Sequence, residues 1–340
     1  MRYSAVYAGI TLLHTALTGA LSIPAAGAPA RSRSAVMKQK GIDFLSAETI
    51  ERAKVGNPIE KAKMAKDPTS AWTDVYEFAA AIRAGTLTWE EVEKQDMNSR
   101  LKYTGMLHRD KRTPGRFMMR LRVPNGLVSA EQMRFYADSV EPYGPELGVI
   151  DITTRQSIQL RGVALEDAGD IHNGLHARNQ TAFQSALDNV RNMVGNPLAG
   201  IDDLEMVDTR PYCNALNDLI SLDPVTVTRG NPVWGNLPRK FNIAVSGGRD
   251  DFSHTHINDI GLQATPHGTT GEMGFNVVLG GYMSIKRVAH ALEMDMCADP
   301  GQTKQLQPEP EAPVPYAPDP TPRYPSPPCP LHRPRAQLVF

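Results

Sequence analysis

The segment that most restricts the fold of this chain is "RFMMRLRVPNG", residues 116–126. Apolar side chains alternate along it, at Phe117, Met119, Leu121 and Val123. Met118, Arg120 and Arg122 occupy the positions between them, so the spacing is the period of two that a β-strand requires. The Pro-Asn-Gly sequence at 124–126 ends this strand in a turn.

The residues that follow predict a β-α-β-β-α order. Ser129 with Gln132 forms a capping box that opens a helix over residues 130–140. Apolar runs at 148–153 and 157–165 predict two strands, and residues 166–177 predict a second helix. This order is typical of the α+β class, with helices packed on one face of a sheet.

Helices are expected before this unit and strands after it. Ser46 is positioned to cap a helix, and Thr88 with Glu91 predicts a capping box opening a helix over residues 89–95. Glycine-bounded apolar runs at 240–248, 259–265 and 274–281 predict neighbouring strands of a second sheet. Residues 284–296 have the spacing of a helix.

Charge and cysteine content exclude several functional classes. The chain has 36 Lys and Arg against 37 Asp and Glu, a formal net charge of −1, so no global field attracts nucleic acid or an anionic membrane. Cys213, Cys297 and Cys329 form no CxxC motif and no disulfide framework. We therefore expect neither nucleic-acid nor membrane binding, and a reducing compartment.

The two ends of the chain differ from the rest. No Asp or Glu precedes Asp43, so residues 1–40 are typical of an organelle transit peptide, although an apolar run before Ala26 also fits a secretory signal. Residues 299–340 hold 13 of the 27 prolines, and we expect a disordered, extended tail.

Two weaker motifs each have an ordinary explanation. Ser246-Gly247-Gly248 could hold a phosphate, but no nucleotide fingerprint surrounds it, and a turn at the end of a strand is favoured. His254 and His256, near Asp259 and His267, lack the spacing of a metal site, so we expect ordinary loop contacts there.

Cationic and polar residues recur at strand edges and loops. They are Arg120, Arg155, Gln159, Arg161, Arg191, Lys240 and Asn242. Arg191 lies in the polar stretch "DNVRNMVGNP", which has neither a core pattern nor a helical one. Converging arginines and lysines bind carboxylates and small oxyanions. Spacing alone leaves open whether these side chains converge or each faces solvent.

Several ordered motifs resemble one family. They are "FMMRLRVPNG", "DITTRQSIQLRG", "DNVRNMVGNPLAGID", "RGNPVWGNLPRKFN" and "GFNVVLGGYMS". Over residues 40–298 the chain resembles the N-terminal half of ferredoxin–nitrite reductases, in the nitrite/sulfite reductase family. The resemblance implies a helical segment at 41–110, a ferredoxin-like half-domain at 111–180 and an incomplete sirohaem and substrate-pocket domain at 181–298.

The resemblance also implies roles for the cationic residues. Arg120, Arg191, Lys240 and Asn242 match positions that surround the substrate, where Arg191 would stabilise negative charge on nitrite and help deliver protons. Arg155, Gln159 and Arg161 match positions near the sirohaem carboxylates. Sulfite reductases of this group tend to carry a lysine where this chain has Asn242, which favours nitrite as substrate.

The implied activity is the six-electron reduction of nitrite to ammonium in nitrate assimilation, with sirohaem and a [4Fe–4S] cluster as cofactors. The resemblance further implies ferredoxin as electron donor, a monomer, and the chloroplast stroma. A signal peptide at the N-terminus would instead imply secretion.

One departure from the family pattern concerns the cluster. In the family, four cysteines of the C-terminal half hold it, and Cys213, Cys297 and Cys329 match none of them. We therefore expect an anion pocket without ferredoxin-dependent nitrite reduction by these 340 residues alone. Sulfite reductase, or a non-catalytic fragment that binds sirohaem or an anion, are the alternatives.

Overall fold

The computed structural model describes residues 41–283, 288–289 and 292–294. The expected transit peptide at 1–40 and the proline-rich tail at 299–340 lie outside these residues. No helix in the described part of the chain has the length and apolar character needed to cross a membrane.

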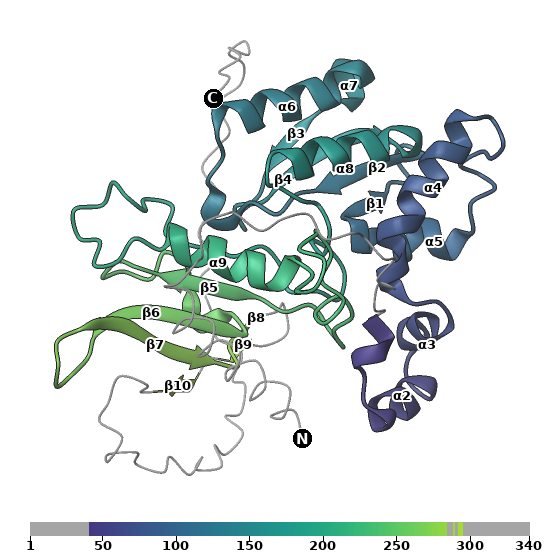
Figure 1. The fold of residues 1–340 in the computed structure, drawn as a ribbon. Coiled ribbons are helices and arrows are strands. Elements are labelled where there is room, and N and C mark those ends of the chain that lie inside the picture. The colour runs from purple at the N-terminus through teal and green to yellow at the C-terminus, as the bar shows by residue number, and fades with distance from the viewer. Residues whose placement is uncertain (1–40, 284–287, 290–291, 295–340) are drawn as a thin grey trace, which may run out of the picture. The chain divides into compact units, whose positions relative to one another are not determined.

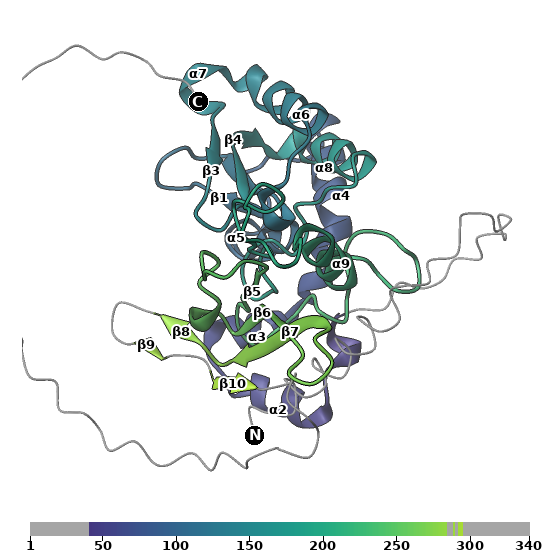
Figure 2. The ribbon, with the colours of Figure 1, turned by 90° about the vertical axis from the view of Figure 1, so that its left-hand side faces the viewer.

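The first sheet is antiparallel and has the strand order β1-β2-β4-β3. Its strands are β1 (Met106–His108), β2 (Arg116–Arg120), β3 (Ile150–Ile152) and β4 (Ile158–Ala164). Helices α6 (Ala130–Val140) and α8 (Ala168–Ala177) lie side by side on one face of this sheet (Figures 1 and 2). The predicted β-α-β-β-α order and the α+β class are confirmed.

Local sequence explains the start of α6. Ser129 Oγ accepts from Gln132 N at 3.2 Å, and Gln132 Oε1 accepts from Ser129 N at 2.9 Å. The predicted capping box is therefore present. Beneath the helices, Phe117, Met119 and Leu160 are completely buried and form the centre of the first core.

The N-terminal part is helical, as expected. It contains α2 (Ala47–Lys54), capped by Ser46, and then α3 (Pro58–Ala65), α4 (Ala71–Arg83) and α5 (Lys94–Asn98). The short α7 (Gly144–Leu147) lies outside this part and follows α6. The prediction of a helix over 89–95 is wrong for residues 89–93, and only residues 94 and 95 are helical. Glu91 accepts from Thr88 N at 2.7 Å, but the Trp89 ring packs against His108 and fills the space beside Gly115. This packing holds residues 89–92 in turns, and α5 begins only at Lys94.

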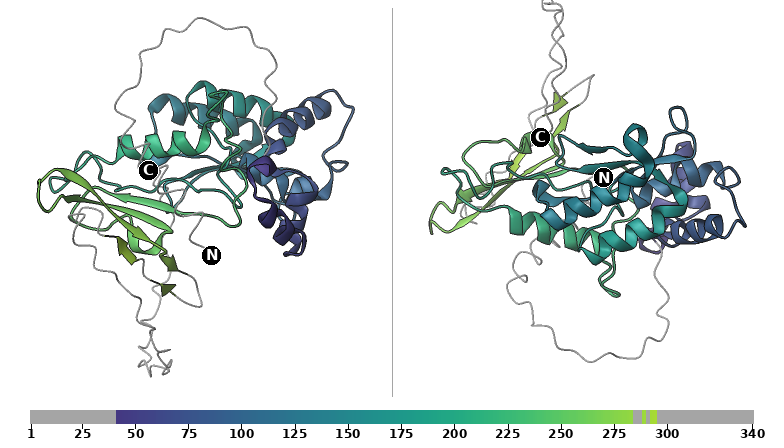
Figure 3. Two further views of the ribbon diagram at one scale, coloured as in Figure 1. Left: turned by 60° about the horizontal axis from the view of Figure 1, so that its bottom comes forward. Right: turned by 90° about the horizontal axis from the view of Figure 1, so that it is seen from above.

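The second sheet has the order β10-β7-β6-β5. Its strands are β5 (Ile243–Ser246), β6 (Ile260–Pro266), β7 (Met273–Leu279) and β10 (Leu292–Met294), with a separate pair β8 (Tyr282–Met283) and β9 (Val288–Ala289). Figure 3 shows the long antiparallel pair of β6 and β7 in green. The predicted neighbouring strands are confirmed, with β5 and β6 parallel.

Helix α9 (Arg210–Ser221) covers the second sheet and is absent from the expected elements. Its Cys213, Leu216 and Ile220 pack with β5 and β6 in the second core. The prediction of a helix over residues 284–296 is wrong for the residues described there, because 288–289 and 292–294 form strands. Residues 292–294 pair with 277–279 of β7, so backbone pairing overrides the helical spacing of the side chains.

Short 3₁₀ turns connect these elements. They are η1 (Gly41–Phe44), η2 (Pro68–Ser70), η3 (Arg100–Thr104), η4 (Pro124–Gly126), η5 (Glu141–Tyr143), η6 (Leu165–Asp167) and η7 (Thr255–Ile257). The predicted turn at 124–126 is η4.

An irregular segment at 189–196 joins the two sheets. Val190 and Val194 form parallel bridges to Phe241 and Ala244, and Asn125 N donates to the Met193 carbonyl at 3.0 Å. The segment therefore lies between the chain that leaves β2 and the chain that enters β5. A buried ion pair also fixes the residue before this segment. Lys63 Nζ lies 2.7 Å from the Asp188 carboxylate and donates to the Leu237 carbonyl at 3.0 Å.

Candidate functional site: an arginine cluster between the two sheets

Arg120 ends β2 and lies opposite Gln159 of β4 in the strand register. With the Gln159 amide oxygen facing the guanidinium, it accepts from Arg120 Nε at 3.3 Å and from Nη2 at 3.1 Å. Both side chains are half-buried. Strand pairing thus holds a cation and a polar amide on one face at the end of the sheet.

Arg155 lies in the turn between β3 and β4. Gln156 has a φ of 55° there, and Gln156 N donates to the Thr153 carbonyl at 2.9 Å. Arg155 Nη1 reaches the Asn258 side-chain oxygen at 3.4 Å, just before β6. The turn therefore brings a cation from the first sheet to the edge of the second.

Arg191 lies in the joining segment. Its backbone N donates to the Phe241 carbonyl at 2.8 Å, which fixes the main chain beside the start of β5. The side chain is half-buried, and its Nε is buried without a hydrogen-bond partner among the described residues.

The three guanidiniums repel one another. Burial, and then the charge of Arg191, lower the pKa of Arg120. Burial, then Arg191, and more weakly Arg120 lower the pKa of Arg155. Burial and then Arg239 lower the pKa of Arg191. The structure therefore brings Arg120, Arg155 and Arg191 within electrostatic reach of one another.

Little negative charge in the described part of the chain offsets this cluster. None of the three arginines forms an ion pair with a described carboxylate. Asp259 is the acid shared by Arg155 and Arg191, and its own pKa is raised because it is half-buried. A half-buried group of cations without ion-pair partners is suited to binding an anion.

Asn242 contacts Asp259, the acid near Arg155 and Arg191, and Lys240 lies in the loop before it. The strand predicted over residues 240–248 begins only at Ile243, so neither Lys240 nor Asn242 lies on it. Phe241 bonds to the joining segment, and Asn242 N donates to the Asp259 carboxylate at 2.7 Å. The Asn242 side-chain oxygen is buried without a partner among the described residues, whereas Lys240 is exposed.

Arg161 is an expected site residue that the structure does not bring to the cluster. It lies on β4 two residues after Gln159, and its guanidinium forms an ion pair with Asp151 of β3. Its charge is therefore already compensated, unlike that of Arg120.

Two buried polar residues near the cluster are not among the expected site residues. Arg122 alternates with apolar residues and was expected to face away from the core with Arg120, yet it is 1% exposed. Asn192, next to Arg191, is 3% exposed. Both bond to backbone atoms far along the chain, so no local motif marks them. Their buried polar character becomes visible only in the fold.

The described residues contain no group of three or more His, Cys, Asp or Glu side chains able to hold a metal ion. Of the three cysteines only Cys213 is described, and burial raises the pKa of its thiol to about 12. Residues in the described ranges therefore do not fit the ligand set of an iron–sulfur cluster. The histidines at 254 and 256 lie in and beside η7, where His256 contacts Gln263.

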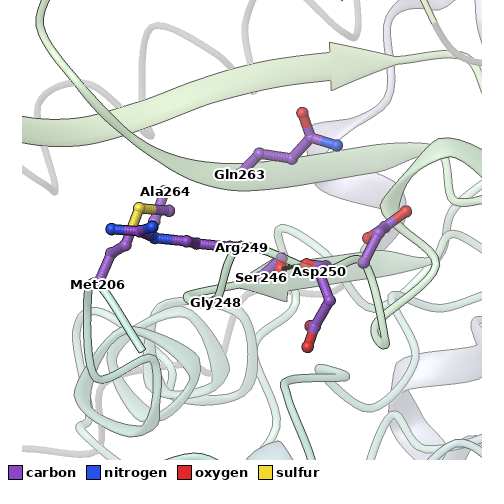
Figure 4. Close-up of a pocket in the computed structure, with 8 residues that line it drawn as sticks. Met206, Ser246, Gly248, Arg249, Asp250, Gln263 and Ala264 are labelled. Atoms are coloured by element: carbon purple, nitrogen blue, oxygen red, sulfur yellow. Dashed lines mark hydrogen bonds between the residues drawn. The ribbon is translucent and has the colours of Figure 1, made fainter. Parts of the chain in front are cut away.

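A separate small pocket lies at the C-terminal end of β5, the end away from Asn242 (Figure 4). It has a volume of about 230 Å³, and its lining includes Met206, Ser246, Gly248, Arg249 and Asp250. Ser246 Oγ donates to the Asp250 carbonyl at 2.8 Å, and the Gly247 carbonyl accepts from Met206 N. These bonds close a turn at the end of a strand, as expected for residues 246–248.

Comparison with known proteins places the chain in a family. Residues 109–178 match the nitrite/sulfite reductase ferredoxin-like half domain, and residues 186–303 match the nitrite and sulphite reductase 4Fe-4S domain. The chain belongs to the nitrite/sulfite reductase family. The arginine cluster lies where these two matched regions meet.

Curated relatives carry a more specific name. The chain is 45% identical over 240 residues to a chloroplastic ferredoxin–nitrite reductase of Zea mays, covering 70% of this chain and 41% of that protein. It is 43% identical over 239 residues to a ferredoxin–nitrite reductase of Synechococcus elongatus, covering 70% of this chain and 44% of that protein. The chain thus spans less than half the length of these relatives.

A solved structure shares the fold. The Mycobacterium tuberculosis NirA protein matches with a TM-score of 0.58 at 23% sequence identity, covering 70% of this chain and 43% of that one. This likeness supports the arrangement of the two sheets.

Proposed function

We propose that this chain supplies the anion-binding half of a ferredoxin-dependent nitrite reductase, which reduces nitrite to ammonium in nitrate assimilation. The observation that carries the proposal is the cluster of Arg120, Arg155 and Arg191, which lacks ion-pair partners among the described residues. The family match and the names of the curated relatives support nitrite reduction as the reaction.

The cluster fits sirohaem, a macrocycle that carries several carboxylates. Arg155, with Gln159 beside Arg120, would hold these carboxylates from the β4 side. Arg161 would join them only by giving up its ion pair with Asp151. Guanidinium groups bind carboxylates through two parallel hydrogen bonds, which fixes orientation as well as charge. When bound, sirohaem supplies the iron that exchanges electrons with the substrate.

Arg120, Arg191, Lys240 and Asn242 would surround nitrite. Arg191 Nε is buried without a described partner, so it can donate to a nitrite oxygen without first losing a protein contact. Asn242 Oδ1 is likewise buried without a described partner, but as an acceptor it suits the N–H groups of the ammonium product and not nitrite itself. An anion between the guanidiniums removes their mutual repulsion and raises their lowered pKa values again. The arginines then stay protonated while negative charge develops on the substrate oxygens.

The remaining parts of the proposal rest on the relatives. Their names imply ferredoxin as the electron donor and, for the plant proteins, a chloroplast location. A monomer, which the family resemblance implies, is part of the same proposal. The described residues do not fit the ligand set of an iron–sulfur cluster.

Uptake of sirohaem tests the proposal. The 340-residue chain is produced in cells that overproduce sirohaem, and its haem content is read from visible absorbance per protein. We expect the parent chain to bind sirohaem and Arg155→Gln to lower the content several-fold. Arg116→Gln, on the same strand as Arg120 but bonded to Gly162 and stacked on Tyr143, is the control and should leave the content unchanged. A parent chain without haem, or an Arg155→Gln chain with full content, contradicts the proposal.

A further inference from the structure

The side chain of Asn192 makes the two backbone hydrogen bonds to Val123 that a neighbouring β-strand would otherwise make. Val123 N donates to Asn192 Oδ1 at 2.8 Å, and Asn192 Nδ2 donates to the Val123 carbonyl at 2.8 Å. Val123 follows β2 three residues after Arg120, where the regular ladder has ended. One buried amide therefore fixes the main chain that leaves the Arg120 strand.

The same amide reaches the turn that carries Arg155. Asn192 Nδ2 also donates to the Arg155 carbonyl at 3.0 Å and lies 3.3 Å from the Gln156 carbonyl. Asn192 itself directly follows Arg191. A single side chain thus hydrogen-bonds the backbones of two segments, which carry Arg120 and Arg155, from a third segment that carries Arg191.

Only an amide of this length meets these demands. Asparagine offers one acceptor and two donors, whereas aspartate lacks the donors and serine cannot bridge all three segments at once. Asn189, in the same segment and fully buried, differs in its contacts, because its Nδ2 donates locally to the Ala186 carbonyl at 2.7 Å. The two asparagines therefore allow local stabilisation to be separated from cluster geometry.

We propose that Asn192 is a positioning residue that sets the spacing of Arg120, Arg155 and Arg191 and thereby the affinity of the cluster for an oxyanion. The inference rests on the proposed function only in one respect, namely which anion the cluster binds in the cell. Guanidiniums held at a fixed spacing bind a tetrahedral or bent oxyanion at several points. When the segments separate, each arginine binds alone and the gain from preorganisation is lost.

The test uses the full chain without added cofactor and inorganic sulfate as the probe. The melting temperature is measured in sodium sulfate and in sodium chloride of equal ionic strength, for the parent, Asn192→Ala and Asn189→Ala. Both variants remove a buried amide without adding charge. A ligand that binds only the folded state raises the melting temperature, by about 3–6 °C at roughly tenfold above its Kd.

We expect sulfate to stabilise the parent and Asn189→Ala equally, although both alanine variants melt lower in chloride. Asn192→Ala should lose most of the sulfate increment, equivalent to a Kd about tenfold weaker or more. If Asn192→Ala does not fold, Asn192→Ser, which keeps an oxygen for Val123 N, is measured instead.

An undiminished sulfate increment in the Asn192 variant overturns the inference, as does an equal loss in Asn189→Ala or no increment in the parent. Sulfate binding requires neither sirohaem nor nitrite. A chain that binds sulfate through Asn192 but takes up no sirohaem would therefore contradict the proposed function and leave this inference intact.

Discussion

Arg122 Nη2 donates to the carbonyl of Arg191 at 3.3 Å, so one arginine holds the backbone of another. The same guanidinium donates to the carbonyls of Val190 at 2.6 Å and Gln184 at 3.0 Å, and to Asn217 Oδ1 at 2.8 Å. Burial, and then Arg229, lower the pKa of Arg122 to about 9, which still leaves it charged at neutral pH. Arg122 and Asn192 therefore hold the segment that presents Arg191 to the cluster.

Replacing Arg122 should destabilise the fold strongly. Arg122→Met fills a similar volume but leaves three buried carbonyls and the Asn217 oxygen without a donor. We expect the free energy of unfolding to fall by about 3 kcal/mol or more, because unsatisfied buried polar groups are costly. Urea denaturation measures this. Arg116→Met, half-buried at the other end of β2, should cost less than about 1 kcal/mol, and equal losses would contradict the assignment.

Gly195 should tolerate no side chain. A Cβ there would lie 1.3 Å from Asn125 Oδ1, which also accepts from Thr209 Oγ1 at 3.1 Å. Asn125 is 8% exposed, so it has little room to move. We expect Gly195→Ala to cost about 1–3 kcal/mol in the free energy of unfolding. Gly268→Ala, where a Cβ meets nothing within 4 Å, should change it by less than about 0.5 kcal/mol. Similar values for both variants in urea melts would refute the prediction.

His172 should make stability depend on pH. It is fully buried among Tyr76, His176 and Phe183, and neither ring nitrogen has a partner among the described residues. Burial, and then His176, lower its pKa from 6.5 to about 3. The unfolded chain then binds one more proton than the folded chain between these values. Stability is therefore greatest above pH 6.5 and falls as the pH drops toward 3, by up to about 1.4 kcal/mol per pH unit.

The variant His172→Phe removes this proton and keeps an aromatic ring. Thermal melts between pH 7 and pH 5 should show a shallower loss of stability than the parent, with little change at pH 7 because no buried bond is lost. His254→Asn, at an exposed position with a φ of 50°, is the control and should keep the parental slope. Parallel slopes for His172→Phe and the parent would show that this ring does not titrate on unfolding.

Features encoded within a few residues were predictable. The Ser129 and Gln132 capping box, the alternation in β2 and the glycine-bounded strands β5, β6 and β7 all appear in the fold. Features that depend on distant partners were not. Thr88 and Glu91 have the spacing of a capping box, but Trp89 is held by residues 108 and 115, and no helix forms.

The site shows the same division. The alternation of the sequence predicts that Arg122 faces the same way as Arg120. In the structure Arg122 is buried, because its guanidinium donates to the carbonyls of residues 184, 190 and 191. The family resemblance named Arg120, Arg155 and Arg191 but not the spacing between them. That spacing is set by Asn192, whose acceptors lie 36 and 69 residues away in the chain. The roles of the named site residues in nitrite binding stay predictions.

Nitrite affinity tests the central claim most directly. Nitrite is titrated into the sirohaem-loaded chain, and its Kd is read from the change in haem absorbance, for the parent, Arg191→Gln and the control Arg116→Gln. Glutamine keeps hydrogen-bonding capacity and removes the charge. We predict a Kd about tenfold higher or more for Arg191→Gln, since a charged hydrogen bond contributes about 1.5–3 kcal/mol, with haem content and melting temperature near those of the parent. A Kd for Arg191→Gln within about twofold of the parent and the Arg116→Gln control would contradict the account.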